Sequence, residues 1–151
     1  MNLAKNLETT ASFFPDRPAI SEDLSETSYK QLNDRANRVA TALLQMGIQA
    51  GDHVGLCAPN SADWLAFYFG VLKAGAVAVT LSSQLKKDEL DLLINHSRPI
   101  MIFTFDEKLE GLSALRDDNC LRTIISPRGD MSFNDLMEKG SGNFRAVDSE
   151  R

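Results

Sequence analysis

The sequence has few of the side chains that build metal sites and disulfide frameworks. Two cysteines, Cys57 and Cys120, and two histidines, His53 and His96, are spread over 151 residues. This spacing matches no zinc pattern, and two cysteines so far apart favour buried free thiols over a disulfide. We therefore expect no metal site.

Basic residues are also too few to suggest a polyanionic partner. The chain has 16 Lys and Arg against 21 Asp and Glu, a formal net charge of −5. With no basic cluster among aromatic residues, nucleic acid and anionic membranes are poor candidates as main partners. No apolar run approaches the roughly 18 residues of a transmembrane helix, and the start has no signal-peptide core. We predict a cytoplasmic protein without a transmembrane segment.

The nine glycines form no loop that would cradle phosphate groups. No G-x-G-x-x-G pattern follows a predicted strand, which argues against a dinucleotide-binding oxidoreductase. Gly140-Ser141-Gly142 is the nearest candidate, but no predicted strand precedes it and no lysine follows it. Because a phosphate site needs backbone N–H groups and a cation, we expect no residue of this chain to hold ATP.

The residues that are present predict a layered α/β domain. Strand-like apolar runs begin near His53, Val77, Ile100 and Thr123, at intervals of 24, 23 and 23 residues. Helical patterns fill the intervals, over residues 61–74, 86–95 and 107–115. Such intervals fit a strand, a helix and two loops, and they indicate right-handed βαβ crossovers on a parallel sheet. The runs are apolar at successive positions, which predicts strands covered by helices on both faces.

Local signals define the elements before the sheet. Apolar spacing predicts a helix over 3–13, and residues 19–22 and 26–28 are compatible with a small hairpin. Ser28 and Gln31 form a capping-box pattern at the start of a long one-sided helix that Gly47 ends.

The helix over 61–74 contains the single tryptophan, Trp64. Its apolar side chains from 64 to 72 point nearly all round, which predicts burial on more than one side. Asn60 or Ser61 is its expected N-cap, and Gly75 its expected stop. We interpret Trp64 as a core or interface anchor rather than as a substrate wall.

The character of the chain changes after Pro127. A helix capped by Ser132 is predicted through Met137, followed by a polar linker or frayed tail. We divide the chain into an α/β subdomain over residues 1–126 and a short helix with a polar linker over 127–151.

Three stretches together resemble a known family. They are FFPDRPAI, TSYKQLNDRANRVATALLQMGIQAGD, and GDHVGLCAPNSADWLAFYFGVLKAGAVAVTL with DEL at 88–90. This combination, over residues 5–105, resembles the N-terminal region of the adenylate-forming enzymes. Pro-Asn-Ser after the first strand is typical of the acyl-CoA synthetase branch. Where that family usually has two prolines, this chain has Thr80-Leu81-Ser82-Ser83, which we interpret as variation without loss of fold.

The resemblance implies the N-terminal part of the large domain of an ATP-dependent acid–CoA ligase. Such an enzyme uses ATP, Mg²⁺ and CoA to convert a carboxylic acid, here expected to be a fatty acid, into acyl-CoA, AMP and pyrophosphate. The family's phosphate loop and catalytic lysine have no counterpart in residues 1–151. We therefore expect no catalytic residue in this chain, an inactive fragment, and self-association as a dimer through surfaces left bare.

One turn is a candidate ligand contact. In relatives, the turn matching Ser82–Lys87 can lie near the CoA nucleotide, so Gln84, Lys86 and Lys87 are candidates for its phosphates. The ordinary alternative is that both lysines form the solvated start of a helix, paired with Asp88 and Glu89.

Other functions remain open at this point. Asp106 ends a predicted strand, as the phospho-acceptor of a receiver domain would, although the acidic pair of that fold is missing. His53 and His96 have no partner nearby in sequence for catalysis. A stand-alone interaction module, or an adenylation domain of another branch of the family, are the remaining alternatives.

Overall fold

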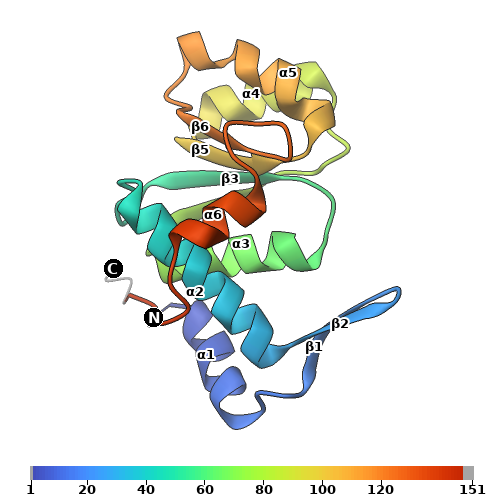
Figure 1. Ribbon diagram of the computed structural model, residues 1–151. Coiled ribbons are helices and arrows are strands. Elements are labelled where there is room, and N and C mark those ends of the chain that lie inside the picture. Colours follow the sequence, from blue (N-terminus) through green and yellow to red (C-terminus); the bar gives the residue numbers. More distant parts are fainter. Residues whose placement is uncertain (1, 148–151) are drawn as a thin grey trace.

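A four-stranded parallel sheet separates two layers of helices (Figure 1). The computed structural model describes residues 2–147. The strands are β3 (His53–Cys57), β4 (Val77–Thr80), β5 (Met101–Thr104) and β6 (Thr123–Ile125), in the order β4-β3-β5-β6. All three pairings are parallel. The predicted α/β class, with a parallel sheet and βαβ crossovers, is confirmed.

The crossovers distribute the helices between the two faces of the sheet. Helix α3 (Ala62–Lys73) joins β3 to β4 on one face. Helices α4 (Lys87–Ser97) and α5 (Asp106–Ala114) lie on the other face, and a short 3-10 turn, η1 (Arg116–Asp118), follows α5. Helix α6 (Phe133–Lys139) returns to the face of α3 (Figure 1).

The elements before the sheet follow their local signals. They are α1 (Ala4–Phe13), the antiparallel hairpin β1 (Pro18–Glu22) and β2 (Ser25–Ser28), and α2 (Tyr29–Gln45). The Oγ atom of Ser28 accepts the Gln31 backbone N–H at 3.1 Å, and Gln31 Oε1 accepts the Ser28 N–H at 2.9 Å. This is the predicted capping box, and Gly47, at φ +92°, follows the end of the helix.

Strand alternation divides the core into two clusters. On the α2/α3/α6 face, Phe103 stacks on Phe67 at 5.0 Å between ring centroids and meets Phe133 edge-on at 5.8 Å. On the α4/α5 face the cluster is aliphatic apart from a thiol, and consists of Cys57, Leu90, Ile94, Ile102, Leu112, Leu121 and Ile124.

Two elements are less buried than their sequences predict. Strand β4 lies at the sheet edge, so Val77 is 44% exposed. Helix α3 buries Ala66, Phe67 and Gly70 against its neighbours, but Trp64 and other apolar side chains on its outer side are only partly buried. The reason is that α3 packs closely on α2, whereas α1 covers its outer side only in part.

The segment after α6 is not the unpacked linker that its composition predicts. Asn37 Nδ2 donates to the Gly142 carbonyl at 2.7 Å, and the Ser141 N–H donates to Thr41 Oγ1 at 2.6 Å. A Cβ atom at Gly140 would lie 1.8 Å from the Arg38 carbonyl oxygen. The two glycines therefore permit close contact with α2. The rest of the predicted tail, 148–151, lies outside the described residues, and the division at residue 126 stays a prediction.

The two cysteines differ in burial. Cys57 is a buried free thiol as predicted, whereas Cys120 is only partly buried, with Sγ 3.0 Å from the Arg98 carbonyl oxygen. Within residues 2–147, every helix is too short or too polar to cross a membrane.

Candidate functional site

The strand order fixes where a site is expected. From β3 the chain passes to β4 on one side, and then returns past β3 to β5 on the other side. The carboxyl ends of β3 and β5 therefore flank a point where the direction of winding reverses. In open α/β sheets, ligands bind in the crevice at such a point.

A cleft of about 290 Å³ lies at this point. Its walls are mainly apolar, with Ala58 and Pro59 after β3, Phe103 and Phe105 at the end of β5, and Phe133 at the start of α6. Its polar groups are Ser61, Asp63, Thr104 and Ser126. A cleft of this size and composition fits a small apolar group or an apolar side chain.

Most polar groups of the cleft already have structural tasks. Thr104 Oγ1 donates to the Cys57 carbonyl at 2.7 Å, which links β5 to β3. Ser61 Oγ accepts the Trp64 N–H at 3.0 Å and caps α3. The exception is Ser126, which is 1% exposed and whose Oγ has no hydrogen-bond partner among residues 2–147. Sequence reasoning missed Ser126, and only its place directly after a strand would have drawn attention to it.

Asp63 is the titratable group of this cleft. Partial burial raises its pKa, the Arg35 charge acts in the opposite direction, and the Glu22 carboxylate adds to the rise. Asp63 lies in the first turn of α3, where a carboxylate complements the helix dipole. No hydrogen bond joins Asp63 to Ser61, Thr104 or Ser126, the hydroxyl side chains of the cleft lining, so Asp63 is not paired with a nucleophile for acid–base catalysis.

The predicted ligand turn, Ser82–Lys87, follows the carboxyl end of β4, and none of its residues lines this cleft. Lys87 Nζ is 2.6 Å from Asp91 Oδ2, one helical turn away, and this lysine side chain is 65% exposed. The Asp91 carboxylate raises the pKa of Lys87. Lys86 and Gln84 are exposed, Lys86 as the N-cap residue of α4. The lysines thus form the start of a solvated helix, and their contact with CoA stays a prediction.

Two buried or half-buried neighbours hold this turn. Cys57 Sγ lies 3.5 Å from the Ser82 carbonyl oxygen, and Lys108 Nζ donates to the Leu85 carbonyl at 2.5 Å. Burial raises the pKa of the Cys57 thiol, and the nearby Lys108 charge acts in the opposite direction. Lys108 is a contact that the sequence did not reveal, because it comes from the first turn of α5.

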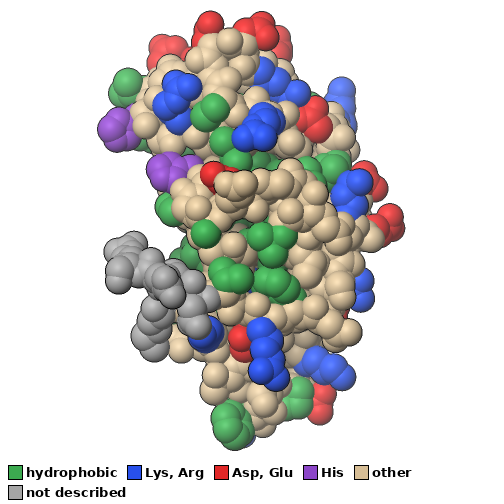
Figure 2. Space-filling model, turned by 90° about the vertical axis from the view of Figure 1, so that its left-hand side faces the viewer, with side chains coloured by type: hydrophobic (Ala, Val, Ile, Leu, Met, Phe, Trp, Pro, Cys, Tyr) green, Lys and Arg blue, Asp and Glu red, His purple; other side chains and the backbone are tan. Residues whose placement is uncertain are grey.

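The remaining candidates lie elsewhere or have structural roles. Figure 2 shows both histidines on one face of the molecule; His53 begins β3, at the amino edge of the sheet, and its Nδ1 lies 2.7 Å from the Ser97 carbonyl oxygen. His96 lies in the last turn of α4. Asp106 Oδ1 accepts the Arg128 N–H at 2.9 Å and so orders the loop after β6. Trp64 stacks on Tyr68 at 5.4 Å, as an anchor would.

The described residues offer neither a cluster of metal-ligating side chains nor, at Gly140–Gly142, an open loop for a phosphate. Over the described part of the chain, no three His, Cys, Asp or Glu residues are grouped to hold a metal ion. Gly140 and Gly142 press against α2, and so their segment cannot wrap around a phosphate. We therefore derive no chemical step through ATP, Mg²⁺ or CoA from these residues.

Known proteins are similar to this chain in sequence and in fold. The description "AMP-binding enzyme" belongs to the family that matches residues 7–148. A medium/long-chain-fatty-acid–CoA/3-oxocholest-4-en-26-oate–CoA ligase of Mycobacterium tuberculosis is 34% identical over 126 residues, 83% of this chain and 23% of the ligase. A dimodular nonribosomal peptide synthase of Bacillus subtilis is 32% identical over 107 residues, 71% of this chain and 4% of the synthase.

A solved structure of a CoA ligase has the same fold as this chain. The anthranilate CoA ligase AuaEII, in complex with anthranoyl-AMP, superposes with a TM-score of 0.92 and 28% identity over 100% of this chain and 30% of its own. The chain thus spans less than a third of the proteins that it matches here. The family match extends over most of the chain, the parallel α/β layer is shared with an acid–CoA ligase, and the three motifs resemble the same family. This chain therefore belongs to the AMP-binding enzyme family.

Proposed function

We propose that this chain is the N-terminal part of an ATP-dependent acid–CoA ligase. The observation that carries this proposal is the superposition of the whole chain on AuaEII, together with its identity to the mycobacterial ligase. The overall reaction joins a carboxylic acid and CoA at the expense of ATP, through an acyl-adenylate, and releases AMP and pyrophosphate. We propose a fatty acid as the substrate and fatty-acid metabolism in the cytoplasm as the setting.

In this proposal residues 2–147 are scaffold and carry no catalytic group. The cleft between β3 and β5 has no base paired with a nucleophile, and its unpaired hydroxyl, Ser126, is buried. Positioning and charge neutralisation at the phosphoryl group would come from other parts of the enzyme. ATP, Mg²⁺ and CoA are thus ligands of the whole enzyme, and we expect the chain of 151 residues to be inactive by itself.

A panel of acids tests the proposed reaction on the complete gene product. Exchange of labelled pyrophosphate into ATP should depend on a fatty acid, and CoA should then yield a thioester detectable by mass spectrometry. Exchange that responds to amino acids and not to fatty acids would instead assign the chain to the peptide-synthetase branch. The match to the Bacillus subtilis synthase is the observation that favours this second candidate.

The turn Ser82–Lys87 provides a residue-level test of CoA binding. If Lys87 meets a CoA phosphate, Lys87→Ala in the complete enzyme should raise the KM for CoA and leave the KM for ATP unchanged. Lys139→Ala, an exposed lysine in the last turn of α6, is the matched control. Unchanged CoA kinetics in Lys87→Ala would end this assignment.

We also propose that the 151-residue chain self-associates as a dimer. Strand β4 is an edge strand, Val77 is 44% exposed, and apolar side chains on the outer side of α3 are only partly covered. Such edges and apolar patches favour association. Light scattering at increasing concentration should give a dimer mass, and a monomer mass throughout would contradict the proposal.

A further inference from the structure

The carboxylate of Glu8 connects three segments that lie far apart in the sequence. Its Oε1 atom accepts a hydrogen bond from Lys73 Nζ at 2.5 Å and a second from the Ala146 N–H at 2.6 Å. The Lys73 side chain is 0% exposed and that of Glu8 is 22% exposed. Because a buried ammonium group needs a partner, one oxygen of Glu8 stabilises both the end of α3 and the segment near Ala146.

Asn2 makes a second connection between the same segments. Its side chain is buried, and Nδ2 donates to the Leu72 carbonyl at 2.5 Å and to the Val147 carbonyl at 2.9 Å. The Val147 N–H in turn donates to the Lys73 carbonyl at 3.0 Å. Both backbone groups of Val147 are therefore bonded to residues more than 70 positions away in the chain.

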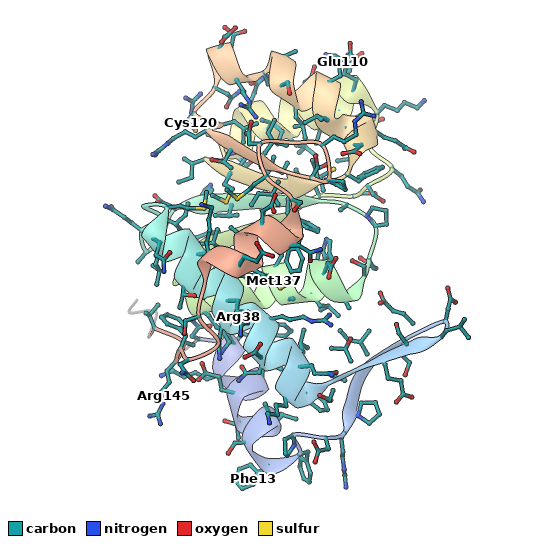
Figure 3. The ribbon with its side chains drawn as sticks, in the orientation of Figure 1. Phe13, Arg38, Glu110, Cys120, Met137 and Arg145 are labelled. Carbon is teal, nitrogen blue, oxygen red and sulfur yellow. The ribbon has the colours of Figure 1, made fainter. Side chains whose placement is uncertain are left out.

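Residues 144–147, called the strap below, pass closely over the end of α3. Gly75 has φ +80°, and a Cβ atom there would lie 2.7 Å from Val147 Cγ2. Figure 3 shows Arg145, within the strap, beside the upper end of α1. Figure 1 shows the same corner, where the strap lies near the start of α1. The strap therefore packs against Gly75, where a larger residue would clash with Val147.

Helix α1 is short and depends on tertiary contacts. It has 10 residues, of which Ala4, Leu7 and Ala11 are buried, and the Asn2 side chain, rather than that of the N-cap residue Leu3, accepts the Ala4 N–H at 2.9 Å. A helix of this length is marginal without tertiary contacts. Because Asn2 and Glu8 belong to the start and the middle of this segment, bonds to the strap supply a large part of its polar anchoring.

We infer that α1 and the strap form one cooperative unit, in which each keeps the other docked. Glu8 and Asn2 are its positioning residues, and Lys73, at the end of α3, is the buried cation to which Glu8 is bonded. Coupling of this kind is reciprocal, so a change in the strap must loosen α1, and a change in α1 must loosen the strap. This inference does not depend on which acid or thiol the enzyme uses.

Limited trypsin digestion of the 151-residue chain tests one direction of the coupling. Cleavage after Arg145 requires the strap to leave its place, whereas cleavage after Arg128, in the exposed loop after β6, does not. Loss of hydrogen bonds to a charged group should raise the rate after Arg145 by about tenfold or more in Glu8→Ala. The rate after Arg128 should stay unchanged. Glu110→Ala, on the far helix α5 (Figure 3), is the matched control.

Hydrogen exchange tests the reverse direction. Ala146→Pro removes the N–H that Glu8 accepts, and amides of α1 should then exchange about tenfold faster or more, whereas those of α4 should not. Arg145→Ala, which lies in the strap but makes none of these bonds, should leave α1 exchange unchanged.

Each result supports or overturns the inference. Faster cleavage after Arg145 alone in Glu8→Ala, with faster α1 exchange in Ala146→Pro, supports it. Unchanged rates in either variant, or equal acceleration at Arg128 and Arg145, would overturn it. If Glu8→Ala does not fold, Asn2→Ala replaces it, because this variant leaves no buried charge unpaired and should also accelerate cleavage after Arg145.

Discussion

The two faces of the sheet are built in different ways. The α4/α5 face is covered by helices that directly connect neighbouring strands in sequence, and its core is aliphatic. The α2/α3/α6 face assembles helices from distant parts of the chain around stacked phenylalanines. The comparison shows that local crossovers suffice for the first face, whereas the second depends on close, specific packing between remote segments.

The largest expected effect comes from the centre of the aromatic stack. Phe67 is 0% exposed and stacks on Phe103, so Phe67→Ala should lower the free energy of unfolding by about 3–5 kcal/mol. Leu112→Ala, at an equally buried position on the α4/α5 face, should cost less, because fewer atoms are removed. Urea unfolding of both variants measures the difference. An equal or smaller loss in Phe67→Ala would contradict its place in a tightly packed aromatic stack.

Two glycines should respond to the same substitution with opposite signs. A Cβ atom at Gly70, in α3, would lie 2.4 Å from Val39 Cγ1 in α2, so Gly70→Ala should destabilise the protein by about 1–3 kcal/mol. At Gly111, in α5, the nearest atom would be Lys87 Cγ at 3.9 Å, so Gly111→Ala should stabilise by about 0.5–1 kcal/mol. Thermal unfolding of the two variants measures these changes in stability. Changes of the same sign in both variants would contradict the difference in packing between Gly70 and Gly111.

The buried cation on the α3 side gives a pH dependence. Burial lowers the pKa of Lys73 below 10.5, and the hydrogen bond and charge of Glu8 oppose this effect. Between the lowered pKa and 10.5 the unfolded chain binds more protons than the folded one, so this lysine makes stability rise with pH. In Lys73→Met this rise of the free energy of unfolding with pH should be absent, as urea unfolding at a series of alkaline pH values up to 10.5 would show. Identical pH profiles of wild type and variant would show that Lys73 is not a buried cation.

The smallest effect is expected from the thiol of the other face, and it has the opposite sign. Burial raises the pKa of Cys57 above 9.0. Above this value the unfolded thiol ionises first and the folded state holds the proton, so the contribution of Cys57 to stability falls as pH rises. Above this pH the free energy of unfolding should therefore fall in wild type and should fall less in Cys57→Ala. Cys120→Ala, at a partly buried thiol, is the control. A wild-type profile unaffected by Cys57→Ala would contradict its burial.

Much of the fold was predictable because its signals are local. The capping box of Ser28 and Gln31 lies within four residues, and the strand intervals follow from the length of a crossover. The docking of the strap was not predictable, because its partners Asn2 and Glu8 lie 145 and 138 residues away. Only the helical spacing of Lys73 from Ala66 and Gly70, both buried, hinted that this lysine faces inward.

The candidate site was predictable only in part. Sequence reasoning expected ligand contacts at a strand's carboxyl end, and it named the turn Ser82–Lys87. It missed the cleft between β3 and β5, because the position of that cleft depends on β3 lying between β4 and β5. It also missed Ser126 and Lys108, whose contacts arise from packing between elements that are not adjacent in sequence.

We propose above that this chain is part of the scaffold of an AMP-binding enzyme and does not activate acids by itself. The most direct test of this proposal is exchange of labelled pyrophosphate into ATP, measured with the purified 151-residue chain and a panel of carboxylic acids, beside the complete gene product. We expect background exchange for the chain with every acid and acid-dependent exchange for the complete protein. Exchange above background by the chain alone would contradict it.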